Sequence, residues 1–302
     1  MKQGTICVQG AYRPKNGEPR VLPIVQSTTY KYDSSVEMGD LFDLKKSGYF
    51  YSRLQNPTND TVAAKITMLE GGVAGMLTSS GQAANFFAVF NIAQAGDHIV
   101  SSSAIYGGTY NYLEHTFPEF GVTTTFVDPE VDGAFEAAIQ DNTKAIFIET
   151  LGNPNSNLID IEEIAKIAHA HNIPLVVDST FATPYLVRPI EYGADIVVHS
   201  ATKFIGGHGT AIGGVIVDSG NFDWAKSGKF PHLVEPNASY HGISFANDVG
   251  AAAFVTYIRA ILLRDTGATL SPFHAFIFLQ GLETLSLRVE RHVENALKIV
   301  DY

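Results

Sequence analysis

Short apolar runs of strand type alternate along the middle of the chain with stretches that repeat at helical spacing. Seven such runs are AGMLTSS, DHIVSSS, VTTTFVD, KAIFIET, PLVVDST, ADIVVHS and GGVIVD. Helical patterns such as QAANFFAVFNIAQ and IEEIAKIAHAHN separate several of them. Continuous apolar runs are typical of strands that are buried on both faces. The pattern therefore predicts an α/β fold with a mostly parallel seven-stranded sheet between helices.

The flanking segments lack this alternation. Residues 1–57 show no strong periodicity and are predicted to form an extended N-terminal arm that contacts a partner subunit. The α/β domain is expected over 58–272, and it includes an irregular insertion at 218–247 that is rich in Gly, Pro, Asn and Ser. Residues 273–302 have the pattern of a long helix without a stop signal, so we expect them to begin a truncated C-terminal domain.

Composition narrows the class of protein. The 302 residues are 45% hydrophobic and 17% charged, which is typical of a folded chain with a large core. A net charge of −11 argues against a nucleic-acid partner. The single cysteine, Cys7, fits a reducing compartment. The N-terminus lacks an apolar signal core, and the window VGAAAFVTYIRAILL contains Arg259 and is expected to be too short for a bilayer. We therefore expect a cytoplasmic protein without a membrane partner.

One lysine stands out at the end of a predicted strand. In ADIVVHSATKFIGGHGTAIGG, Lys203 follows the apolar run and precedes a glycine-rich loop. A buried lysine shifts its pKa readily and can form a Schiff base, while Ser200 and Thr202 can donate hydrogen bonds to an anion. A nucleotide P-loop places its lysine after the glycines, which is the opposite order. Taken alone, the stretch fits an active lysine or an ordinary solvated one.

Polar residues also follow other predicted strands. Ser80, Gly81 and Gln82 open a helix, where free N–H groups can bind an anion or simply carry a cap. Tyr106 can stack on a flat cofactor or pack in the core. Asp178 ends an apolar strand, and a buried carboxylate is costly without a partner. A protonated pyridine nitrogen is one such partner, and a turn or cap role is the other interpretation.

Three further candidates carry less information. Asn153, in ETLGNPN, can hydrogen-bond a ring oxygen or mark a turn. Arg53, in YSRLQNP, can clamp a phosphate or be a surface charge. His169 and His171 do not share a helix face because they are two positions apart, so we expect no metal site there.

Together, the motifs YSRLQNPT, SSGQAA, YGGTYN, ETLGNPN, VVDSTF and SATKFIGGH resemble those of the Cys/Met-metabolism (trans-sulfuration) family of pyridoxal phosphate enzymes. The resemblance extends from VQGAYRP to GLETLSLRVERH, over nearly the whole chain. Within the family, the long insertion with GNFDW, GKFPHL and PNASYHG is similar to that of O-acetylhomoserine sulfhydrylases. The resemblance implies the aminotransferase-like fold, fold type I.

The resemblance also implies a role for each candidate. Lys203 would bind the aldehyde of pyridoxal 5'-phosphate, and Tyr106 would stack on its ring and assist proton transfer. Asp178 would pair with the ring nitrogen, Asn153 would contact the 3-oxygen, and Thr180 would touch the opposite ring face. The phosphate would be held by Ser80, Gly81, Gln82, Ser200 and Thr202, joined by Tyr51 and Arg53 from the neighbouring subunit of a homodimer or homotetramer.

The implied reaction is γ-replacement on O-acetyl-L-homoserine by sulfide or a thiol, giving homocysteine or methionine and acetate. In it, Lys203 would move protons at Cα and Cβ. The family's arginine for the substrate carboxylate lies in a C-terminal domain that would follow this sequence. Methionine γ-lyase or cystathionine γ-synthase activity and a non-catalytic cofactor-binding remnant remain alternatives. The residues do not decide between sulfide and larger thiols, or between acetyl and succinyl esters.

Overall fold

A seven-stranded sheet forms the central layer of the computed structural model, which describes residues 1–302. The strands are β1 (Ala74–Thr78), β2 (His98–Ser102), β3 (Thr123–Val127), β4 (Thr143–Glu149), β5 (Leu175–Asp178), β6 (Ile196–Ser200) and β7 (Gly214–Asp218). Their order is β1-β7-β6-β5-β4-β2-β3, and only β7 runs antiparallel to its neighbours. Six predicted strand segments contain one of these strands, and β4 begins one residue before its segment KAIFIET, so the predicted mostly parallel sheet is confirmed.

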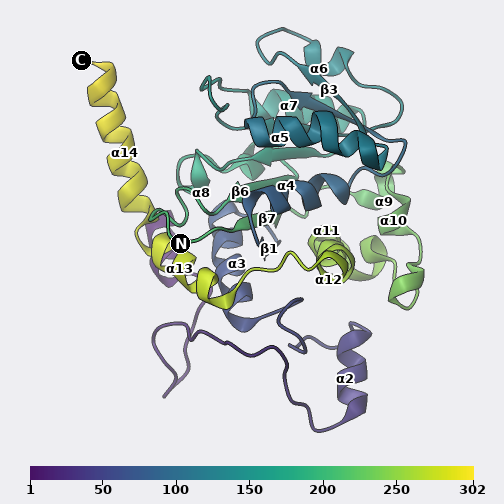
Figure 1. Cartoon of the computed structure of the whole chain (residues 1–302), viewed down its shortest axis with the longest axis vertical. Coiled ribbons are helices and arrows are strands. Elements are labelled where there is room, and N and C mark those ends of the chain that lie inside the picture. The colour runs from purple at the N-terminus through teal and green to yellow at the C-terminus, as the bar shows by residue number, and fades with distance from the viewer.

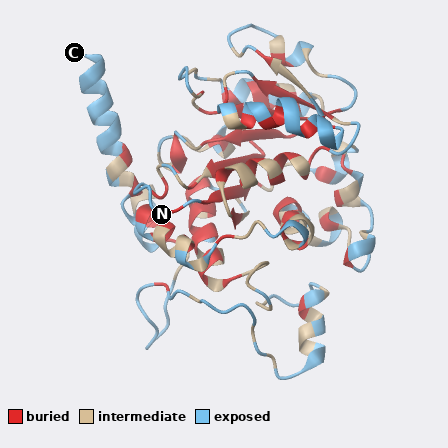
Figure 2. Cartoon of the chain, viewed as in Figure 1, coloured by how far each residue is buried: buried red, intermediate tan, exposed pale blue.

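Helices cover both faces of the sheet (Figure 1). The α-helices of the chain are α1 (Gln3–Gln9), α2 (Ser35–Phe42), α3 (Pro57–Glu70), α4 (Gly81–Phe90), α5 (Gly107–Asn111), α6 (Ala134–Ala137), α7 (Ile161–Ala170), α8 (Thr183–Leu186), α9 (Trp224–Ser227), α10 (Pro231–Val234), α11 (Ala253–Tyr257), α12 (Arg264–Thr266), α13 (Pro272–Glu283) and α14 (Leu285–Val300). Figure 2 shows that most of the sheet is buried, whereas most of α14 is exposed.

The apolar core divides into two clusters because successive strand side chains point to opposite faces. On β5, Val177 belongs to the cluster that includes residues of α3, α7 and α13. Its neighbour Val176 belongs to the cluster that includes residues of α4 and α11. The same alternation places Val197 and Val198 of β6 in different clusters. Both faces of these strands are therefore apolar, as the continuous runs in the sequence require.

The arm and the insertion both contain short helices. α1 packs beside α3, and the ammonium group of the buried Lys65 donates to the carbonyl oxygens of Cys7 (3.0 Å) and Val8 (3.3 Å) in its last turn. The segment that carries α2 extends away from the sheet (Figure 1). In the insertion, α9 buries Trp224, whose ring stacks on Phe254 with centroids 5.1 Å apart. Apolar side chains thus anchor a segment whose composition is typical of a loop.

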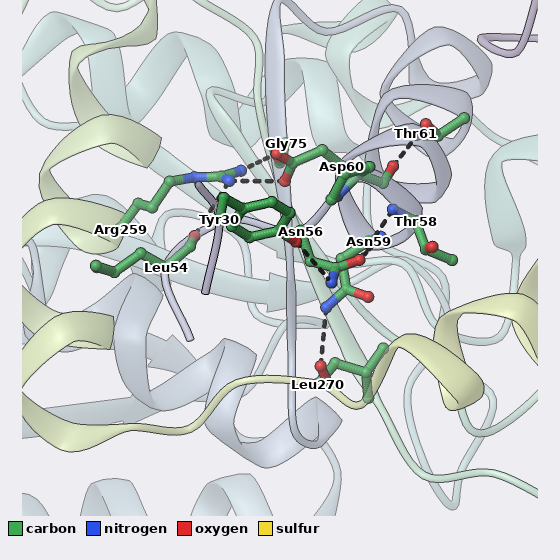
Figure 3. A network of polar contacts seen from close by, with 11 residues as sticks. Tyr30, Leu54, Asn56, Thr58, Asn59, Asp60, Thr61, Gly75, Arg259 and Leu270 are labelled. Atoms are coloured by element: carbon green, nitrogen blue, oxygen red, sulfur yellow. Dashed lines mark hydrogen bonds and ion pairs between the residues drawn. The ribbon is translucent and has the colours of Figure 1, made fainter. Parts of the chain in front are cut away.

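Figure 3 shows a polar network that joins the start of α3 to distant segments. The Asn56 side chain caps α3 by accepting the Thr58 N–H at 2.9 Å. Asn59 Nδ2 donates to the Leu270 carbonyl at 2.8 Å, and Arg259 Nη1 lies 2.7 Å from Asp60 Oδ1. The N-terminal end of α3 therefore holds the segments on either side of α12 against the sheet.

The helical run that contains Arg259 corrects one expectation. It spans Phe245–Thr266, 22 residues that include an 18-residue window with a mean hydropathy of 1.3, and is long and apolar enough to cross a membrane by those criteria. The sequence window considered above was expected to be too short. Phe254 and Ile258 in this run are fully buried in the core, and the ion pair between Arg259 and Asp60 also faces the protein.

We predict that His98 makes folding less favourable in weak acid. Its ring nitrogens lie 2.8 Å from the hydroxyl oxygens of Thr143 and Thr125, and burial lowers its pKa below the usual 6.5. As the pH drops through 6.5, His98 binds a proton more readily in the unfolded chain than in the folded chain, so the stability of the folded state falls. In His98→Gln, the free energy of unfolding from urea titrations should depend less steeply on pH from about pH 7 to about pH 5. Identical slopes for His98→Gln, the exposed control His115→Gln and the wild type would contradict this role.

Candidate functional site

A cavity of about 590 Å³ lies at the carboxyl ends of β4, β5 and β6 and against the start of α4. Ligands of parallel α/β sheets bind at this edge. Most of the sequence-predicted site residues line the cavity: Ser80, Gly81, Gln82, Tyr106, Asn153, Asp178, Thr180, Ser200, Thr202 and Lys203. Its other lining residues are Asn85, Gly108, Glu149, Phe181 and Ile212. The fold thus brings together side chains from five separate motifs.

The first turn of α4 forms one end of the cavity. The Ser80 hydroxyl caps this helix by accepting the Ala83 N–H at 3.0 Å, and the N–H groups of Gly81 and Gln82 have no acceptor within the helix. A Cβ atom at Gly81 would lie only 2.5 Å from the Ser200 Cβ, so glycine is required for this close approach. Free N–H groups, the helix dipole and the Ser200 hydroxyl thereby form a site suited to a phosphate.

At the end of β5, Asp178 provides a carboxylate, which favours a cation, whereas the first turn of α4 favours an anion. Its side chain is 7% exposed, and it accepts hydrogen bonds from Asn85 Nδ2 (3.2 Å) and from the N–H (3.0 Å) and hydroxyl of Thr180. The Thr180 oxygen in turn accepts the Ser200 N–H at 2.8 Å. No lysine, arginine or histidine forms an ion pair with Asp178. A buried carboxylate without a cation suits a protonated ring nitrogen.

Lys203 and Tyr106 present reactive and aromatic groups to the same cavity. Lys203 lies in the loop after β6, where its N–H donates to the Ser200 carbonyl at 3.1 Å and its carbonyl accepts the Gly207 N–H at 2.7 Å. Tyr106 precedes α5 and is 51% exposed. A Cβ atom at Gly108 would lie 2.5 Å from the Tyr106 ring, so a side chain at position 108 would clash with the ring in this position.

Glu149 is a site residue that the sequence analysis missed. It pairs with Asp178 in the register of β4 and β5, is 4% exposed, and accepts the Tyr106 N–H at 2.7 Å. Burial raises the pKa of Glu149 to about 8, and the charge of Asp178 adds to the increase. An acid at the end of an apolar strand was the signal that identified Asp178, and KAIFIET carries the same signal. Asn85, a polar residue in the apolar segment QAANFF, was also missed.

Tyr51 and Arg53 do not line this cavity. The Arg53 guanidinium donates to the Arg264 carbonyl oxygen and lies 5.2 Å from the centre of the Tyr51 ring. Their predicted place in the site of a neighbouring subunit stays a prediction. The residues that do line the cavity fit pyridoxal phosphate. They offer an amine, an aromatic ring, a phosphate cradle and a carboxylate without a cation.

Comparisons with known proteins agree with this arrangement. The homocysteine synthase of Schizosaccharomyces pombe is 51% identical over 94% of this chain and 66% of its own length. The O-acetyl-L-homoserine sulfhydrylase of Leptospira meyeri is 46% identical over 100% of this chain and 70% of its own. A crystal structure of an O-acetylhomoserine (thiol)-lyase from Campylobacter jejuni, which contains a pyridoxyl-lysine phosphate, superposes with a TM-score of 0.96 at 37% identity, covering 100% of this chain and 75% of that one.

The family described as Cys/Met metabolism PLP-dependent enzyme matches residues 4–302. This match covers nearly the whole chain, as the motif resemblance does, and it agrees with the donor set of the cavity. The chain therefore belongs to the Cys/Met metabolism family of pyridoxal phosphate-dependent enzymes.

Proposed function

We propose that this chain catalyses γ-replacement on O-acetyl-L-homoserine, in which sulfide displaces acetate and homocysteine forms. The observation that carries the proposal is the placement of the Lys203 amine in one cavity with Asp178 and the phosphate cradle of α4. The relatives named homocysteine synthase and O-acetyl-L-homoserine sulfhydrylase support the choice of substrate. We propose sulfide as the acceptor because one of these names refers to a sulfhydrylase and the other gives homocysteine, the product that forms from sulfide.

Each end of the cavity has a separate task in this reaction. Pyridoxal phosphate, when bound, supplies the electron sink for carbanion chemistry. The N–H groups of Gly81 and Gln82 and the Ser200 hydroxyl hold its phosphate. Asp178 keeps a proton on the ring nitrogen, because a buried carboxylate favours a cation beside it.

Lys203 performs the proton transfers. When the cofactor is bound, this amine would attach to its aldehyde carbon. The free amine would remove the substrate Cα proton and serve as acid and base at Cβ. The Tyr106 ring, which lines the cavity, would stack on the cofactor, and its hydroxyl would assist proton transfer.

We predict that Lys203→Ala lowers turnover by more than about 10³-fold, because the variant loses both the attachment point and the base. It should also lose the visible absorption of the lysine-bound cofactor. Borohydride reduction and peptide mapping of the wild type should locate the pyridoxyl group on Lys203. A reduced adduct at another lysine, or normal turnover by the variant, would contradict the assignment.

We predict that kcat/KM is at least about tenfold higher for O-acetyl- than for O-succinyl-L-homoserine. The succinyl ester adds a carboxylate to a cavity that already contains Glu149 and Asp178, with Lys203 as its only cation. Product analysis by mass spectrometry should detect homocysteine and acetate when sulfide is offered. A preference for the succinyl ester, or 2-oxobutyrate as the main product from methionine, would instead identify a cystathionine γ-synthase or a γ-lyase.

We propose that Tyr51 and Arg53 complete the phosphate site of a second subunit, and a mixing experiment tests this. Arg53→Ala and Lys203→Ala chains are each expected to be nearly inactive. Denatured and refolded together, they should recover about a quarter of wild-type activity, since half of the random dimers are hybrids with one intact site. If both residues served the same chain, no activity would return on mixing.

A further inference from the structure

The loops that follow β2 and β4 meet at one side of the cavity. A Cβ atom at Gly152, after β4, would lie 2.8 Å from the carbonyl oxygen of Ala104, after β2. This contact leaves no room for a side chain between the two loops. Tyr106 and Asn153, two of the residues expected to contact the cofactor ring, lie on these loops. Any group that fixes the loops therefore also fixes that wall of the cavity.

Glu149 occupies this junction. It is the last residue of β4, and its Oε1 accepts the Tyr106 N–H at 2.7 Å. Tyr106 precedes the five-residue helix α5 and makes no side-chain capping bond of its own. The carboxyl group of Glu149, at the start of the loop after β4, thus accepts a hydrogen bond from the loop after β2.

We propose that Glu149 is a positioning residue for the cofactor, whose carboxyl oxygen holds the start of α5 and thereby keeps the Tyr106 ring over the cavity. The inference rests on the cofactor site of the proposed function, but not on the choice of substrate. The role requires an acceptor oxygen at this place and does not require a charge. Asp178 beside it already supplies a carboxylate, and a second charge there is unfavourable because it is buried and repelled.

The test compares Glu149→Gln, which keeps an acceptor oxygen, with Glu149→Leu, which has none. Exposed Glu119→Gln serves as the control. The full chain is stripped of cofactor, and its Kd for pyridoxal phosphate is measured by absorbance titration. Glu149→Leu should raise the Kd by about 5- to 100-fold, the range for an N–H left without its acceptor, while Glu149→Gln should stay within about threefold of wild type.

Hydrogen–deuterium exchange gives a second readout that needs no cofactor. The Tyr106 amide should exchange faster in Glu149→Leu than in the wild type, and at nearly the wild-type rate in Glu149→Gln. Unchanged exchange and Kd in Glu149→Leu would overturn the proposal. Equal losses in both variants would also overturn it, because they would assign the effect to charge.

Folding and function are controlled separately. If Glu149→Leu does not fold by circular dichroism, Glu149→Ser replaces it, since its hydroxyl is too short to reach the Tyr106 amide and the strand end stays polar. Both readouts are independent of turnover, so they hold even if O-acetylhomoserine is not the substrate. Failure of the wild-type chain to bind pyridoxal phosphate would instead remove the cofactor site on which the inference rests.

Discussion

The buried carboxylate of Asp178 is the constraint on which the site depends. It cannot be placed at the end of an apolar strand without hydrogen bonds, and Asn85 of α4 and Thr180 after β5 supply them. Thr180 then accepts the Ser200 N–H at the end of β6. A single carboxylate therefore fixes α4, β5 and β6 relative to one another. The helix proposed to cradle the phosphate and the strand that leads to Lys203 are both linked to the carboxylate proposed to face the ring nitrogen.

The sheet was predictable from the sequence because its strands are buried on both faces, so each appears as an apolar run with a polar end. Asp178 and Lys203 could be identified because they interrupt that pattern at strand ends. Glu149 interrupts it in the same way, but its motif drew attention to Asn153 four residues later. Asn85 was harder to find, since a helical asparagine between apolar residues acquires its role only when β5 lies beside it.

Other features depend on contacts that no local pattern encodes. The insertion has the composition of a loop, yet Trp224 stacks on Phe254 in a helix 30 positions later. Arg259 lies in an apolar run, and its partner Asp60 is nearly 200 residues away. Tyr51 and Arg53 are a third case, because their proposed ligand belongs to a second chain. In each case the partner is distant in sequence or absent from the chain, so composition and spacing could not locate it.

The charges of the site are separated in the same way as those of the cofactor that fits it. One part of the cavity is lined by backbone N–H groups, hydroxyls and a helix dipole, and Lys203 is the only lysine or arginine of this chain in the whole lining. At the other end two acids lie side by side in the register of β4 and β5. A dianion in the middle of this cavity would be repelled by the acids, and a cation at the cradle would be repelled by the dipole. A ligand with a negative phosphate and a positive ring nitrogen satisfies both ends at once, which explains how a chain of net charge −11 can hold an anionic cofactor without a basic surface.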